Sequence, residues 1–167
     1  MYTGLLHLHN IGRWILILLL VIAIINAFAG MRRNEPVSKG HKKIGLFLMI
    51  TAHTMLLVGL YQWIVGPWGL KQIQELGMGG VMKNSISRFW AIEHLAGMLI
   101  AIILITIGRG AIKKPIADRA KHKKMFWMFF IAFILIMASV PWPGREVARP
   151  LFPGTERPAE IYNDPTE

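Results

Sequence analysis

Cysteine is absent from this chain of 167 residues. Without thiols the chain forms no disulfide bond, no covalent link to a c-type haem and no cysteine-ligated metal or iron–sulfur site. The sequence also has no Gly-rich phosphate-binding loop, no H-E-x-x-H motif and no G-x-S-x-G motif. The usual signatures of nucleotide binding, zinc proteolysis and serine hydrolysis are therefore missing, and no catalytic residue is predicted.

Apolar residues, in contrast, make up 54% of the chain and gather in long runs. Four runs, at about 5–29, 44–66, 89–108 and 125–140, are each close to the ~20 residues that a helix needs to cross the hydrocarbon core of a bilayer. Lipid offers no hydrogen bonds to the backbone, and these runs lack the alternation of barrel strands, so they are predicted to be helices. The fold class is all-α: residues 1–143 are predicted to form an integral membrane four-helix bundle with up-down topology.

Positive charge is concentrated between the apolar runs. Of the 19 Lys and Arg, five lie within 32–43 and seven within 109–124. Both segments follow odd-numbered helices, so the positive-inside rule places them in the cytoplasm and both termini outside the cytoplasmic membrane. This distribution is not that of a nucleic-acid-binding surface, despite the net charge of +10. Residues 144–167 are predicted to form an extended, proline-containing external tail.

Three histidines, His9, His53 and His94, lie in or close to three different apolar runs. An ionisable side chain at membrane depth is costly, normally faces the bundle interior and marks a functional site. Imidazole is also an axial ligand of haem iron, so two of these histidines are predicted to hold one haem b or another metal centre near the outer face.

His9 and His94 are the natural pair. With a rise of ~1.5 Å per residue, both lie roughly 10 Å inside the outer boundary, whereas His53 lies near the midplane. In up-down order their helices are diagonal, and each histidine is followed three residues later by a glycine that would leave room for a macrocycle. Because a tilt of the helices can compensate for a difference in depth, a ligand pair that includes His53 is an alternative.

Two charged residues accompany this pair. Arg13 is four residues after His9, on the same helical face, and is a candidate for binding a haem propionate. Glu93 precedes His94 and is a candidate partner of Arg13 or a carrier of protons.

His41 and His122 each begin a His-Lys-Lys run beside the two basic segments. Neighbouring lysines and headgroup water are expected to keep these histidines solvated, so a second haem is not predicted there. The repeated order of His-x-x-Gly, apolar run and His-Lys-Lys suggests a duplicated helical hairpin.

The segments LHNIGRWILILLL, MITAHTMLLVGLY, SRFWAIEHLAGMLIAIILITIG and HKKMFWMFFIAFILIMASVPW resemble a family of small bacterial four-helix membrane proteins labelled cytochrome b-like. The resemblance covers about residues 5–143. It places six residues on positions typical of the family: His9, His53, His94, Arg13, Arg88 and Trp142. It implies b-type haem and electron transfer in the cytoplasmic membrane, by a carrier or a subunit of an oxidoreductase complex.

The leading hypothesis is therefore a membrane cytochrome b that passes electrons from a membrane donor such as quinol to an external redox partner. A first alternative is a copper or zinc site built from His9, His53 and His94, since imidazole suits both metals. A second is a non-catalytic accessory subunit that packs against other membrane subunits, with its histidines serving helix packing.

Overall fold

The computed structural model describes residues 2–153, and all regular structure in that part is helical. In chain order the elements are α1 (Tyr2–Arg33), α2 (Lys39–Val65), α3 (Leu70–Lys83), α4 (Ser85–Arg88), the π-helical turn η1 (Phe89–Glu93), α5 (His94–Gly110), the 3₁₀ turn η2 (Ala111–Lys113) and α6 (Asp118–Ser139).

Four stretches of helix are long and apolar enough to cross a membrane: Tyr2–Arg33, Lys39–Val65, Ser85–Lys113 and Asp118–Ser139. The shortest has 22 residues, which at ~1.5 Å per residue spans roughly 33 Å. The prediction of four spanning-length helices is thus confirmed. The helices extend beyond the apolar runs, since α1 continues to Arg33 and α6 begins at Asp118 instead of near residue 125.

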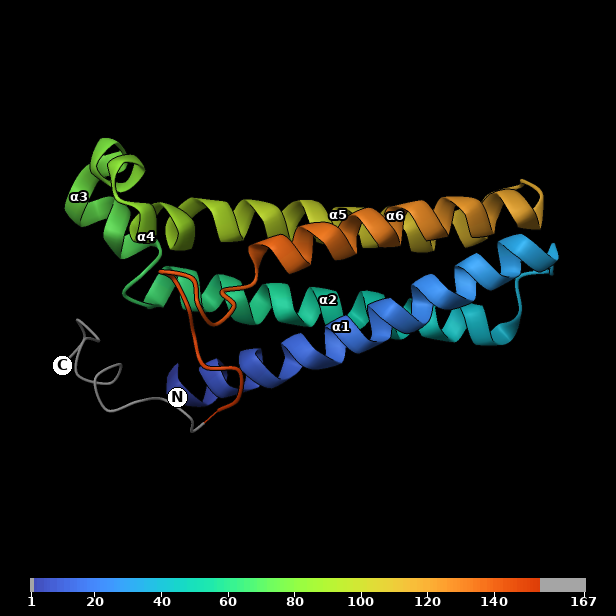
Figure 1. The fold of residues 1–167 in the computed structure, drawn as a ribbon, viewed down its shortest axis with the longest axis horizontal. Helices are drawn as coiled ribbons and strands as arrows, with labels where there is room; N and C mark the ends of the chain where they lie inside the picture. Colours follow the sequence, from blue (N-terminus) through green and yellow to red (C-terminus); the bar gives the residue numbers. More distant parts are fainter. Residues whose placement is uncertain (1, 154–167) are drawn as a thin grey trace.

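The four long helices lie side by side (Figure 1), each packed against two neighbours. Helix α1 contacts α2 and α6, and α5 contacts the same two helices, so α1 is diagonal to α5 and α2 is diagonal to α6. The α1–α2 and α5–α6 connections lie at one end, here called the basic end, and α3 lies at the other. Between them the core contains the fully buried side chains Leu20, Leu48, Ile105 and Phe129.

Residues 141–153, here called the strap, leave α6 and return across the end opposite the basic end (Figure 1). The predicted tail, residues 144–167, is therefore docked in its first part, while 154–167 lie outside the described residues. Side chains of α1 hold the strap: Asn10 Nδ2 donates to the carbonyl of Pro150 at 3.1 Å, and Trp14 Nε1 donates to that of Leu151 at 3.0 Å.

Candidate functional site

The rings of His9 and His94 lie next to each other, with centroids 6.5 Å apart and planes at 63°. His9 comes from α1 and His94 from the first residue of α5, so the pair joins two diagonal helices. His94 directly follows the π-helical turn Phe89–Glu93. Such a turn inserts one residue into a helix and is frequent at functional sites. The π turn therefore helps to set the face on which His94 lies.

The protonation of His94 follows from its hydrogen bond. Its Nδ1 lies 2.8 Å from the carbonyl oxygen of Ser139 on α6. A carbonyl only accepts, so Nδ1 carries the proton and donates, and Nε2 keeps its lone pair. Metal-ligating histidines commonly show this arrangement, in which one ring nitrogen donates to a backbone carbonyl and the other binds the metal. The aromatic rings of Phe89 and Trp90 lie 5.9 and 5.7 Å from the His94 ring.

The hydrogen-bonding groups of the His9 ring are less well satisfied than those of His94. Its Nδ1 is buried and has no hydrogen-bond partner among the described residues. Its ring packs against α2 at Gly59, where a Cβ would lie 3.1 Å from His9 Cε1. An unpaired buried polar atom is destabilising by about 1–3 kcal/mol and calls for an explanation, such as a ligand that supplies the partner.

The separation of this pair suits a shared metal centre. Two imidazoles on opposite sides of one ion, with metal–nitrogen bonds of about 2.0–2.1 Å, have ring centres roughly 6 Å apart. The 6.5 Å between His9 and His94 is close to that value. Because Nε2 of His94 keeps a lone pair and Nδ1 of His9 has no partner among the described residues, these two imidazoles are the residues that would hold a haem iron or another metal ion here.

The two glycines after these histidines do not leave open space, contrary to the prediction. A Cβ on Gly12 would meet the side chain of Met55, and one on Gly97 would meet the hydroxyl of Ser139. Both glycines therefore allow close packing of neighbouring helices, α1 on α2 and α5 on α6.

Arg13 lies one turn after His9 and is partly buried. Its Nη2 donates to Asn10 Oδ1 at 2.6 Å and to the carbonyl of Leu151 in the strap at 2.9 Å. Its Nε is buried without a hydrogen-bond partner in the described part of the chain. One charged donor beside His9 thus remains available to an acidic group.

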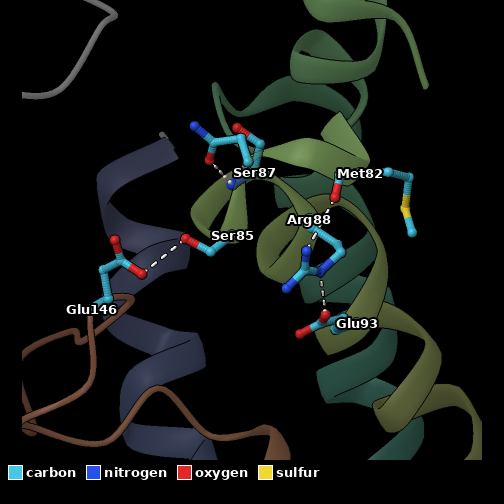
Figure 2. A network of polar contacts seen from close by, with 7 residues as sticks. Met82, Ser85, Ser87, Arg88, Glu93 and Glu146 are labelled. Atoms are coloured by element: carbon cyan, nitrogen blue, oxygen red, sulfur yellow. Dashed lines mark hydrogen bonds and ion pairs between the residues drawn. The ribbon is translucent and has the colours of Figure 1, made fainter. Parts of the chain in front are cut away.

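Glu93 does not pair with Arg13. It lies on the exposed side of η1, where its carboxylate accepts from Arg88 Nε at 2.7 Å (Figure 2). Arg88 also donates from Nη1 to the carbonyl of Met82 at 3.0 Å. Arg88 and Glu93 therefore form a surface ion pair that joins α4 to η1.

His53 does not join the pair. It lies on the exposed side of α2, with its Nδ1 donating to the Met49 carbonyl of its own helix at 2.8 Å. The prediction that it faces the bundle interior is wrong, because α2 turns its neighbours Ala52 and Met55 into the core instead. Within residues 2–153 no group of three or more histidine or acidic side chains is placed to hold a metal ion. The structure therefore does not assemble the three-histidine copper or zinc site.

His41 and His122 also come together, with ring centroids 4.7 Å apart. The expectation that both are solvated is wrong for His122, which is completely buried. The reason is that α6 begins before the His-Lys-Lys run, so that its helical geometry turns His122 inward while Lys123 stays exposed.

Sequence reasoning missed the strap side of the site. Arg149 lies over the rings of Trp68 and Trp90, at 6.0 and 5.2 Å, and the Phe152 ring stacks on Trp14 at 5.8 Å. Together with the hydrogen bonds to Pro150 and Leu151, these contacts pin the strap beside Arg13. No local sequence pattern predicts such contacts, because they join residues about 140 positions apart.

Comparison of the chain with protein-family models, curated proteins and solved structures finds no match. The resemblance to cytochrome b-like proteins accordingly stays a prediction from the sequence, and function has to be inferred from the site.

Proposed function

We propose that the chain is a membrane electron-transfer protein that holds one haem b between α1 and α5 through His9 and His94. The observation that carries the proposal is the pairing of these two rings, 6.5 Å apart, from diagonal helices. When bound, haem supplies one-electron chemistry at its iron, at a potential that the protein adjusts through ligands, hydrogen bonds and burial.

The surrounding residues have distinct roles in this proposal. The Ser139 carbonyl accepts the Nδ1 proton of His94 and holds the ring, which leaves the Nε2 lone pair as the one that would bind the iron. Arg13 Nε, which has no partner among the described residues, would donate to a propionate carboxylate. The rings of Phe89 and Trp90 exclude water from His94.

The proposal includes an orientation. The four long helices span the cytoplasmic membrane as an up-down bundle, with the basic end in the cytoplasm and both termini outside. The His9–His94 pair then lies near the outer face. A quinol in the membrane is the proposed electron donor and an external redox protein the acceptor.

Optical spectroscopy of the protein purified in detergent tests the proposal. Reduction with dithionite is expected to produce the sharp α-band of a low-spin b-type haem. His9→Ala and His94→Ala are each expected to abolish this band. His53→Ala and His7→Ala are the matched controls and should retain it. His53 lies on the exposed side of α2, and His7, two residues before His9, lies on a different face of α1.

A wild-type protein without an α-band overturns the proposal and favours the accessory-subunit hypothesis. Loss of the band in His53→Ala, with the band retained in His9→Ala, overturns the assignment of the ligand pair. Because both outcomes are read from the same spectrum, the cofactor and its ligands are tested together.

A further inference from the structure

His53 is a polar side chain that faces outward from the bundle at membrane depth. It lies one residue past the midpoint of α2 (Lys39–Val65) and is exposed. Its one hydrogen bond in the described part of the chain stays within the helix, from Nδ1 to the Met49 carbonyl at 2.8 Å. Because a carbonyl only accepts, the proton is on Nδ1, and the Nε2 lone pair has no partner among residues 2–153. Such a ring is costly in lipid, and ionisable residues in membrane helices normally face protein or a water-filled cavity.

The outward face of α2 around His53 is otherwise apolar. Exposed side chains follow one another there at alternating steps of four and three residues: Leu46, Ile50, His53, Leu57, Leu60 and Ile64, here called the α2 stripe. Leu57, one turn after His53, is 69% exposed, more than any other large hydrophobic side chain of the described residues. The α2 stripe thus presents one polar ring in the middle of a long apolar surface.

The other long helices show no comparable residue. His53 is the one exposed histidine or charged residue within the middle parts of the four helices, residues 8–29, 44–64, 95–108 and 125–138. The remaining outward surface at this depth therefore suits lipid, whereas the centre of the α2 stripe needs a partner with a polar group at the same depth.

A second copy of this chain supplies that partner by symmetry. Two copies inserted in the same direction are related by an axis along the membrane normal, so α2 of one copy meets α2 of the other in parallel and at equal depth. Each residue of the α2 stripe then lies near its own counterpart, and the two His53 rings come together. The alternating steps of four and three residues match the seam of paired helices, in which a single polar residue fixes the register and the number of chains.

The protonation of the two rings determines what joins them. In each copy Nδ1 donates to the Met49 carbonyl, so both Nε2 atoms are acceptors and cannot bond to each other. One water molecule that donates a hydrogen to each Nε2 satisfies both rings without adding charge. A divalent metal ion with two neutral imidazole ligands would instead carry its full charge at membrane depth, which lipid disfavours.

We propose that the α2 stripe is the contact surface between two copies of the chain in the membrane, with the two His53 rings at the twofold axis and one water molecule between them. The site is incomplete in a single copy, because each chain contributes one of the two acceptors. The inference does not rest on the proposed function, since the His9–His94 pair joins α1 and α5 and contains no residue of the α2 stripe.

Disulfide cross-linking of the full-length chain in membrane vesicles tests this interface, because the chain has no cysteine of its own. Leu57→Cys is expected to form a disulfide-linked dimer on oxidation with iodine, seen at twice the chain mass of 18.9 kDa on a non-reducing gel. Ile131→Cys is the matched control at the same protein-to-lipid ratio. Ile131 is exposed on α6, the helix diagonal to α2, and should give no dimer above the level of random collisions.

A second substitution tests the role of the imidazole. In the Leu57→Cys background, His53→Leu should lower the association constant of the dimer about 3- to 30-fold, the effect of one lost hydrogen bond between helices in lipid. The constant is measured from the dimer fraction as the protein-to-lipid ratio is varied. Thr54→Ala changes an exposed neighbour outside the α2 stripe and should leave the constant unchanged.

Equal cross-linking of Leu57→Cys and Ile131→Cys overturns the interface. A cross-linked product of Leu57→Cys with a mass other than twice that of the chain overturns the second copy as the partner and favours another membrane subunit. An association constant that His53→Leu leaves unchanged or raises overturns the role of His53. Loss of the dimer in EDTA overturns the bridging water in favour of a metal ion.

Discussion

One charged hydrogen bond joins the strap to α1 in addition to neutral contacts from Asn10 and Trp14, and removing that bond has a predictable effect. Arg13 Nη2 donates to the carbonyl of Leu151 at 2.9 Å, beside a neutral bond to the same oxygen from Trp14. A hydrogen bond from a charged group contributes about 1.5–3 kcal/mol. Arg13→Ala should therefore raise the population of molecules with an undocked strap roughly 10- to 100-fold, at 1.4 kcal/mol per factor of ten.

A single introduced thiol reports this population, because the chain has no cysteine of its own. Val147 lies in the strap and is only 8% exposed, so Val147→Cys should react with a water-soluble maleimide mainly when the strap opens. With opening and closing fast relative to labelling, the rate follows the open population. We expect Arg13→Ala in the Val147→Cys background to label about 10–100 times faster than Val147→Cys alone.

Arg32→Ala in the same background is the matched control. Arg32 lies in the last turn of α1 at the basic end, with its guanidinium 5.8 Å from the Phe28 ring, and should leave the labelling rate unchanged. Equal labelling rates for Arg13→Ala and the parent would refute the inference that the Arg13 hydrogen bond helps to hold the strap closed. A comparable acceleration by Arg32→Ala would show that labelling reports general loosening instead.

Two further predictions concern helix packing and the surface ion pair. Gly108→Ala should lower the free energy of unfolding, measured by SDS titration, by about 1–3 kcal/mol, because its Cβ would lie 2.7 Å from Phe129 Cε1 across the α5–α6 contact. Gly110→Ala, whose Cβ would have nothing within 4 Å, should be neutral or stabilising in the same titration. Equal losses of stability in both variants would refute the packing argument. Glu93→Gln should leave the optical spectrum unchanged and change the free energy of unfolding by less than about 1 kcal/mol, because its partner is the partly exposed Arg88. Loss of the α-band in this variant would contradict the placement of Glu93 on the surface, away from the His9–His94 pair.

The long helices were predictable because the bilayer restricts what an apolar run can be. A run of about 20 apolar residues has to satisfy its backbone internally, so type and approximate place follow from hydropathy. The predicted ends of the helices were less accurate. Helix α6 begins at Asp118, seven residues before the predicted start near 125, because basic residues lower the hydropathy without interrupting the helical hydrogen bonds.

The candidate site was predictable only in part. The sequence supports a pairing of His9 with His94 through their similar depth and the order of the helices, and the structure brings the two rings together. The π turn before His94, the acceptor role of Ser139 and the docked strap were not foreseen. Each depends on contacts between residues distant in sequence, for which a single chain carries no periodic signal.

By itself, the sequence determined that four helices can cross a bilayer, that positive charge gathers at one end, and that no thiol takes part in function. Only the tertiary structure decided which histidines face inward: His53 lies outside, whereas His122 is completely buried. The physical reason is that lipid and bundle interior are both apolar. The helix faces that meet them have similar compositions, and packing between helices, rather than hydropathy, sets the rotation of each one.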